Sequence, residues 1–316
     1  MNTLKRMMVA LLALLPLATG MAIADTEHGY SRIFIFGASF MDSGNHFAVT
    51  GITAHPPFEP IGFTYGVGGH RPTNGPTWVE VLAQEMELTE WAKPAYRDPV
   101  FGNYAFAHGH AREAVYPFEK DLGTQVADWV ANGYCTGAPM DDTLFIVDSG
   151  YADLLDIMDA LPDMEKAMGI MYDVAVSIRA NIGILHECGA RNLLFAYLAP
   201  VEYAPISNGG RPPSQIEPIL SWMYNNWYMK PIVVDSLPEG MNVSAVDFHT
   251  GVIGMVAMHK MLGFSNVTDS CITPYVVNDA FCKQRDEYFW WDLVHPTKTA
   301  HAILAEFALG QLPVPD

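Results

Sequence analysis

A serine near the start of the chain, and an aspartate and a histidine near its end, are the residues whose types could together perform nucleophilic chemistry. Ser39 follows the apolar segment Arg32–Phe36 and a glycine, which places its hydroxyl at the end of a buried strand. Asp292 and His295 stand three residues apart, just before Pro296. A serine becomes nucleophilic when a histidine removes its proton, and a carboxylate holds that histidine in the right tautomer. The chain supplies all three groups.

Each of the two motifs has a plainer explanation when taken alone. The segment around Ser39 could be an ordinary Gly/Ser turn. It does not match the G-x-S-x-G pattern, because Met41 takes the place of the second glycine. Asp292 and His295 could be two separately solvated side chains at the start of a helix. It is the presence of nucleophile, base and acid in one chain that favours catalysis.

Five segments of the chain resemble the characteristic blocks of one enzyme family. They are FGASFMDSGN (36–45), RPTNGPTWVEVLAQEMEL (71–88), NYAFAHGHA (103–111), TLFIVDSGYADLLD (143–156) and CKQRDEYFWWDLVHPT (282–297). The family is the GDSL lipase/esterase group of the SGNH hydrolases, and the D-x-x-H-P-T of the last block is its most specific motif. The similarity extends over most of the chain.

The resemblance implies a flavodoxin-like, three-layer α/β/α fold with a mainly parallel central sheet. It implies Ser39 as nucleophile, His295 as base and Asp292 as the partner of that base. It also implies a secreted lipase- or phospholipase-like member of bacterial type, with no metal and no cofactor.

The chain departs from the family at the groups that would stabilise an oxyanion. Ala152 stands where the family has its oxyanion asparagine, and Ala38 replaces the aspartate of the first block. The backbone N–H of Ser39 is one expected donor. Gly109 is the candidate for the second donor, and the N–H of His108 is the alternative, because His108 and Gly109 lie where the family has Gly-Gly-Ala.

Three side-chain groups near these motifs allow more than one interpretation. Tyr151 or His108 could supply the donor that Ala152 lacks. His108 and His110 have a spacing seen in metal sites, but no third ligand lies nearby in the sequence, so no metal is predicted. The aromatic run Tyr288–Trp291 could line an acyl pocket or pack in the core.

Apolar segments of strand length alternate with helical patterns along the chain. The predicted strands are Arg32–Phe36, Thr143–Val147, Asn192–Tyr197 and Val243–Phe248, and the predicted helices are Trp78–Met86, residues 164–187, Ile216–Val233, Val252–Met261 and Thr297–Leu309. Strands separated by helices need crossover connections, which favour a parallel sheet. We therefore expect one α/β domain over residues 25–316, with the Gly- and Pro-rich stretch 43–75 forming a loop over the C-terminal edge of the sheet.

The first residues predict export. Lys5 and Arg6 precede the apolar stretch Met7–Thr19, and an A-x-A site ends at Ala24, so residues 1–24 are predicted to be a signal peptide. We expect the mature protein in the periplasm or outside the cell. The mature chain would keep 15 basic and 35 acidic residues, a net charge of −20. This charge argues against nucleic acid as a partner.

Export would place the four cysteines in an oxidising compartment. Cys271 and Cys282 lie close in sequence around a loop, so a disulfide between them is favoured. Cys188 ends an apolar helical stretch and could be a buried thiol. Whether it pairs with Cys135 stays open.

These patterns favour a secreted serine ester hydrolase that acts through an acyl-enzyme on a small acyl ester or a lipid. Transient contact with a lipid surface is expected, and no obligate protein partner is indicated. Two alternatives remain: a catalytically silent binding protein of the same fold, which Ala152 favours, and an acyltransferase that uses an alcohol as acceptor.

Overall fold

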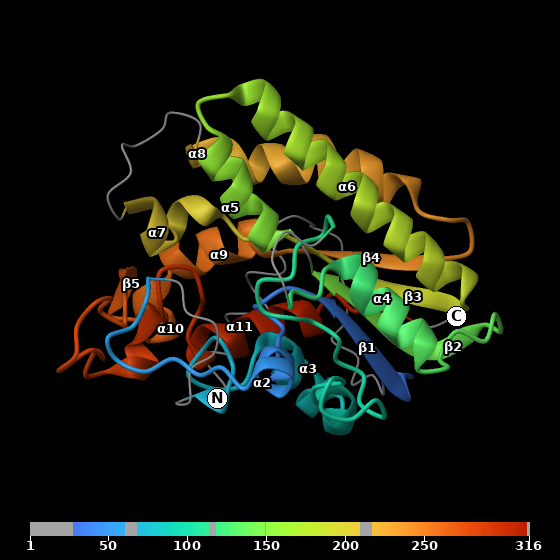
Figure 1. Ribbon diagram of the computed structural model, residues 1–316, viewed down its shortest axis with the longest axis horizontal. Helices are drawn as coiled ribbons and strands as arrows, with labels where there is room; N and C mark the ends of the chain where they lie inside the picture. Colours follow the sequence, from blue (N-terminus) through green and yellow to red (C-terminus); the bar gives the residue numbers. More distant parts are fainter. Residues whose placement is uncertain (1–27, 61–67, 114–117, 149, 209–216, 315–316) are drawn as a thin grey trace.

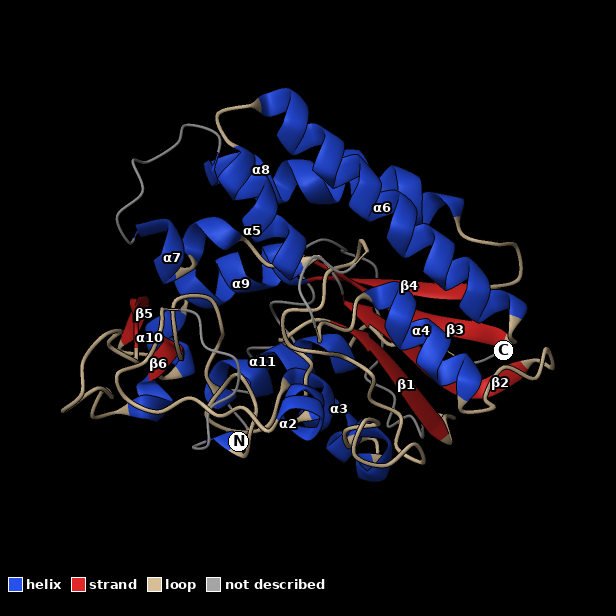
Figure 2. Cartoon of the chain, viewed as in Figure 1, coloured by secondary structure: helices blue, strands red, loops and turns tan. Residues whose placement is uncertain are grey.

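The centre of the molecule is a parallel four-stranded sheet (Figures 1 and 2). The structure, a computed structural model, describes residues 28–60, 68–113, 118–148, 150–208 and 217–314. The predicted signal peptide, residues 1–24, lies outside the described residues. The strands lie side by side in the order β1 (Arg32–Gly37), β2 (Met140–Asp148), β3 (Ala190–Tyr197) and β4 (Asn242–Asp247). All three pairings are parallel, which confirms the predicted α/β class.

A short extended segment, residues 102–106, runs along the other edge of β1. The N–H of Tyr104 donates to the carbonyl of Ile35 at 2.8 Å, and the N–H of Phe106 donates to the carbonyl of Gly37 at 3.0 Å. When this segment is counted as the second strand of the chain, the strand order becomes 2-1-3-4-5, which is the flavodoxin-like order. The connections leave β1 and β2 in opposite directions, and α/β proteins place their ligand sites at such a point.

Helices cover both faces of the sheet, as Figure 1 shows, so the three-layer α/β/α fold is confirmed. The helices of one face are α4 (Leu122–Ala131), α5 (Tyr151–Ala160), α6 (Met164–Glu187), α8 (Glu217–Met223) and the π-helical segment η4 (Tyr224–Val233). Those of the other face are α3 (Trp78–Glu85), α9 (Phe248–Ala257) and α11 (Lys298–Leu309). Successive strand residues face opposite sides, so Phe34 and Phe36 pack on the first face and Ile33 and Ile35 on the second.

The predicted strands and long helices are confirmed, with shifted ends. The predicted strand Val243–Phe248 ends at Asp247, because the Asp247 carboxylate accepts the Thr250 N–H at 3.0 Å and so begins α9 at Phe248. The predicted helix Ile216–Val233 changes after α8 into η4, whose wider turns accommodate Pro231.

Several elements were not predicted from the sequence. They are α2 (Asn45–Thr50), α4, α5 and a separate two-stranded parallel sheet of β5 (Asn266–Ser270) and β6 (Tyr288–Trp290). The remaining short elements are α7 (Pro205–Asn208), α10 (His259–Leu262), η2 (Thr89–Ala92), η3 (Val201–Tyr203), η5 (Val234–Ser236) and η6 (Arg285–Glu287). Helix α2 lies within the predicted loop 43–75, of which residues 61–67 are outside the described part.

Both pairs of cysteines form disulfides. The predicted bond between Cys271 and Cys282 is confirmed. Cys135 bonds to Cys188 and so ties the loop after α4 to the end of α6. Cys188 is therefore buried, as expected, but it is not a thiol.

Helix α6 is long and apolar enough to cross a membrane by length and composition alone. One face of it carries Met171, Val174 and Ile178, which are fully buried against the sheet and the neighbouring helices. This packing is that of a core helix.

A carboxyl group is buried at the end of β2. Asp148 is 1 % exposed, and neither of its side-chain oxygens accepts a hydrogen bond within the described part of the chain. Burial raises the pKa of Asp148 to about 8, although the nearby Trp78 indole opposes the shift. The group therefore keeps its proton at neutral pH, because an unpaired charge is costly in an apolar interior.

We expect Asp148→Asn to become more stable relative to the wild type as the pH rises from about 4 to about 8. In this range the folded wild type holds a proton that the unfolded chain has released, so its stability falls with pH, and the amide removes that loss. Above about pH 8 the difference should level off. Urea unfolding across this range measures it.

Asp173→Asn, on the exposed face of α6, is the matched control and should show no such trend. A constant difference between Asp148→Asn and the wild type would contradict a neutral Asp148.

Candidate active site

Ser39 lies in the turn directly after β1, at the carboxyl end of the sheet. The turn begins at Gly37, where an added Cβ would come within 1.9 Å of the Asp148 carbonyl oxygen, so only glycine fits. The buried side chain of Gln125 fixes Gly37 from α4. Its Oε1 accepts the Gly37 N–H at 2.8 Å, and its Nε2 donates to the Gly37 carbonyl at 2.9 Å. Sequence reasoning missed Gln125, because nothing local in its helix marks this role.

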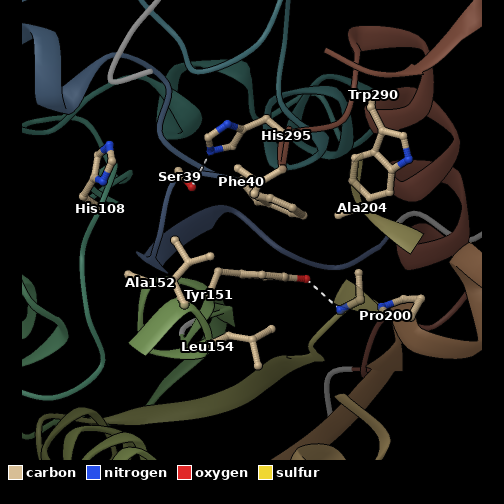
Figure 3. A pocket seen from close by; sticks show the side chains of 13 residues that line it. Ser39, Phe40, His108, Tyr151, Ala152, Leu154, Pro200, Ala204, Trp290 and His295 are labelled. Carbon is tan, nitrogen blue, oxygen red and sulfur yellow. Dashed lines mark hydrogen bonds between the residues drawn. The ribbon is translucent and has the colours of Figure 1, made fainter. Parts of the chain in front are cut away.

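The three predicted catalytic residues form one hydrogen-bonded chain. His295 Nε2 lies 2.8 Å from Ser39 Oγ (Figure 3), and His295 Nδ1 lies 2.7 Å from Asp292 Oδ2. The other oxygen of Asp292 accepts the N–H groups of His295 at 2.7 Å and Val294 at 2.9 Å. Asp292 and His295 are buried, so bulk water does not compete for these bonds. The geometry is that of a nucleophile, a base and a group that orients the base.

The loop that carries His295 is held from two sides. The Trp291 N–H donates to the His295 carbonyl at 2.7 Å, and the Thr297 N–H donates to the Phe289 carbonyl at 2.8 Å, so β6 and the start of α11 close the loop. From the segment before α3, the buried hydroxyl of Thr73 donates to the Pro296 carbonyl at 2.6 Å.

A pocket opens beside Ser39 and has mainly apolar walls (Figure 3). It is lined by Ser39, Phe40, His108, Tyr151, Ala152, Leu154, Leu155, Ala199, Pro200, Ala204, Trp290, Val294 and His295. The aromatic run 288–291 thus has both expected roles, because Trp290 lines the pocket while Phe289 and Trp291 pack in buried clusters.

The candidate oxyanion donors differ in the hydrogen bonds that their N–H groups already make. The Ser39 N–H has no hydrogen-bond partner in the described part of the chain. The Gly109 N–H donates to the Phe106 carbonyl at 2.8 Å, and Gly109 does not line the pocket. The geometry therefore does not match the expected role of Gly109. It favours the alternative, the backbone N–H of His108, because His108 lines the pocket together with Ala152.

The hydroxyl of Tyr151 does not point toward Ser39. The ring of Tyr151 stacks on Phe40 with 4.1 Å between the centroids, and its oxygen accepts the Ala199 N–H at 2.9 Å (Figure 3). Tyr151 is therefore an apolar wall of the pocket in this structure.

A buried carboxyl group organises the backbone around Ser39. Asp42 accepts the N–H groups of Gly44, Asn45 and His46 from its own turn and of Ala107 from the neighbouring loop, at 2.6–3.1 Å. Burial raises the pKa of Asp42 to about 6, although these four N–H groups favour its charged form. Asp42 thus joins the serine turn to the loop that carries His108.

A second polar network holds the far side of that loop. The His110 ring contacts Glu119 and Asp156, and Arg112 pairs with Asp156 and with Asp153 of α5. Burial lowers the pKa of His110, but the bond to Glu119 and the nearby acids raise it above its usual value overall. These contacts give His110 a structural role. Among the described residues, no cluster of three or more potential ligands could hold a metal ion.

Comparison with known proteins gives relatives of one kind. No family model matches the chain. A GDSL esterase/lipase of Arabidopsis thaliana is 23% identical to it, over 88% of this chain and 83% of that protein. The GDSL esterase/lipase EXL2 of the same plant is 22% identical over 86% of each. The inactive GDSL esterase/lipase-like protein 25, also from this plant, is 22% identical over 89% of this chain and 71% of its own length.

The flavodoxin-like fold and these relatives make the chain similar to hydrolases of the SGNH class. Among these hydrolases, the chain is similar to the proteins named GDSL esterase/lipase. The relatives named above come from a plant, and the expectation of a bacterial-type member stays a prediction.

We expect Thr73→Val to lower the free energy of unfolding by about 1–3 kcal/mol, because the buried Pro296 carbonyl loses its hydrogen bond. Thr73→Ser keeps the hydroxyl and should retain most of the stability. Urea unfolding of both variants beside the wild type measures the difference. Equal stability of Thr73→Val and Thr73→Ser would show that this bond does not hold the His295 loop.

Proposed function

We propose that the protein is a secreted serine ester hydrolase in which Ser39, His295 and Asp292 are the catalytic residues. One observation carries the proposal: the hydroxyl of Ser39 is hydrogen-bonded to His295 and opens into an apolar pocket. The neighbouring Asp292 carboxylate orients the imidazole through Nδ1 and stabilises the imidazolium that forms during the reaction.

The proposed reaction has two steps. His295 Nε2 takes the proton of Ser39 as Oγ attacks the ester carbonyl, and the carbonyl oxygen becomes an oxyanion that accepts the Ser39 N–H. His295 then gives the proton to the departing alcohol, which leaves an acyl group on Ser39. In the second step His295 takes a proton from water, the hydroxide attacks the acyl carbon, and the acid leaves as Ser39 regains its proton.

The walls of the pocket support an apolar acyl group as the part of the substrate that binds next to Ser39. Leu154, Leu155 and Val294 line it with aliphatic side chains, and Phe40 and Trp290 line it with aromatic ones. Binding of hydrocarbon to such surfaces lowers the free energy, because apolar area is removed from water. A polar acyl group would find few hydrogen-bond partners there. An acyl ester or a lipid fits this pocket.

The two disulfides support export, because such bonds persist in oxidising compartments. We propose that residues 1–24 are a signal peptide and that the mature protein begins near Ala24.

A catalytically silent homologue is the competing possibility. Ala152 favours it, since an alanine side chain cannot donate to an oxyanion. One relative also bears the name of an inactive protein.

We expect the mature protein to hydrolyse p-nitrophenyl esters, and Ser39→Ala to lose about 10⁶ of kcat, because the nucleophile is gone. Spectrophotometric assays over a series of acyl chain lengths measure this. A fluorophosphonate should label the wild type at Ser39 and leave the variant unmodified. Equal activity in both proteins would exclude Ser39 as nucleophile, and a folded wild type that neither turns over nor reacts would favour the silent homologue.

We also propose transient contact with a lipid surface through the outer side of one helical layer. The exposed side chains of α6 and of the adjoining α8 and η4 that support it are Met168, Tyr172, Val176, Ile219, Trp222 and Trp227. Trp222 and Trp227 are about half exposed and lie 6.0 Å apart, ring to ring. Tryptophan is favoured at the boundary between hydrocarbon and water. The net negative charge argues for zwitterionic rather than anionic lipid.

Replacing both Trp222 and Trp227 by serine should weaken binding to phosphatidylcholine vesicles by on the order of tenfold or more, because apolar area is lost from the contact. Hydrolysis of a soluble short-chain ester should stay unchanged. Co-sedimentation with vesicles measures binding, and Val100→Ser, at an exposed valine outside this layer, is the control. Unchanged binding of the double variant would contradict the proposal, as would self-association of the wild type through this face.

A further inference from the structure

The pocket beside Ser39 lacks a side-chain hydrogen-bond donor at the position where the family has its oxyanion asparagine. Ala152, the second residue of α5, lines the pocket with a methyl group where the GDSL pattern has an asparagine. The Ser39 N–H is one donor, but acyl-transfer enzymes stabilise the oxyanion with more than one. If the protein is an ester hydrolase, the side-chain donor that the amide would supply has to come from another residue.

His108 lies next to Ser39 in the wall of the same pocket (Figure 3). Figure 3 shows its imidazole on one side of the serine and the Phe40 ring on the other. An imidazole always carries at least one N–H, so it can donate a hydrogen bond in its neutral form as well as in its charged form. Its side chain is thus the polar group of the wall that could face a developing negative charge, apart from the base His295 itself.

The backbone of His108 adopts a conformation that is unfavourable for its residue type. Its φ is +65°, in the left-handed region that glycine enters without a steric penalty. Glycine is the residue expected here, because residues 103–111 resemble a family block that contains Gly-Gly-Ala. A side chain kept in such a conformation at the wall of a catalytic pocket indicates a function for that side chain.

The loop around His108 is held on both sides, so the backbone that carries the imidazole has a fixed place. Before it, the Ala107 N–H donates to Asp42 at 2.7 Å. After it, the Gly109 N–H closes a turn onto Phe106, and the His110 N–H donates to Glu119 at 2.8 Å. Donors that are fixed before the reaction stabilise a transition state without having to reorganise.

The titratable groups near His108 leave its imidazole able to donate a hydrogen bond to an oxyanion. The His46 ring lies 6.3 Å from the His108 ring, and burial together with the His108 charge lowers the pKa of His46 to about 4. His46 is therefore neutral at pH 7. The acid of this region, Asp42, is saturated by four backbone N–H groups.

We propose that the imidazole N–H of His108 is the side-chain oxyanion donor of this enzyme, which acts beside the backbone donors and replaces the amide that is missing at Ala152. The inference rests on the proposed ester hydrolysis. During attack by Ser39 the carbonyl oxygen gains negative charge and accepts hydrogen bonds from the Ser39 N–H and from the His108 ring. No proton is transferred, and the bonds break when the carbonyl re-forms.

The test is His108→Gly, which removes the imidazole and suits the left-handed backbone, so that the variant is expected to fold. We expect kcat for p-nitrophenyl esters to fall by about 10²–10³ with KM little changed, because the donor acts on the transition state. Adding Ala152→Asn to this variant should restore part of kcat by returning an amide to the pocket. Added imidazole should do the same, measured against Ser39→Ala/His108→Gly to subtract the direct reaction of imidazole with the ester.

The matched control is His70→Gly. His70 also has a positive φ, +70°, but it stacks on Phe47 and does not line the pocket, so kcat should stay unchanged. Full kcat in His108→Gly, with Ser39→Ala inactive, would overturn the role of His108 and leave the ester hydrolase intact. A loss that appears only in KM would also overturn it. Activity that survives in Ser39→Ala would overturn the proposed function itself, and with it the role of His108.

Discussion

The hydrogen bond between Ser39 Oγ and His295 Nε2 joins two residues that are 256 positions apart, and much of the structure serves to hold its two ends. The serine end is fixed by β1 and by the clamp of Gln125 on Gly37. The histidine end is fixed by β6, by α11 and by the hydroxyl of Thr73. A displacement of about 1 Å at either end would separate nucleophile and base, which explains why so many buried polar groups surround a single contact.

Burying these polar groups is costly unless each finds a partner, and most of them do. Asp42 accepts four backbone N–H groups, and Asp153 accepts the Ala111 N–H as well as the Arg112 side chain. Asp42 thereby connects the turn of Ser39 to the loop that carries His108, and Asp153 connects α5 to the same loop. Asp148 is one exception among the described residues, since neither of its side-chain oxygens accepts a hydrogen bond and the group stays protonated. The site thus depends on backbone groups that are fixed by buried acids rather than by packing alone.

The wall of the pocket has two kinds of surface. The pocket walls are aliphatic and aromatic, as a site for an acyl group requires. Another part of the wall has a methyl group at Ala152 and an imidazole at His108, whose positive φ a glycine would adopt without strain. The two residues lie in the same pocket wall, on α5 and on the loop held by Asp42.

The sequence by itself determined the parallel α/β layers, the long helices, the disulfide between Cys271 and Cys282, and the three residues of the hydrogen-bonded chain, because apolar periodicity and residue type are local properties. Only the tertiary structure decided which N–H groups of these loops are already used in hydrogen bonds. The N–H of Gly109 is consumed by a turn onto Phe106, and the bond of Cys188 to Cys135 closes a loop of 53 residues. These outcomes depend on contacts between distant segments, whose geometry is fixed by close packing and not by any local pattern.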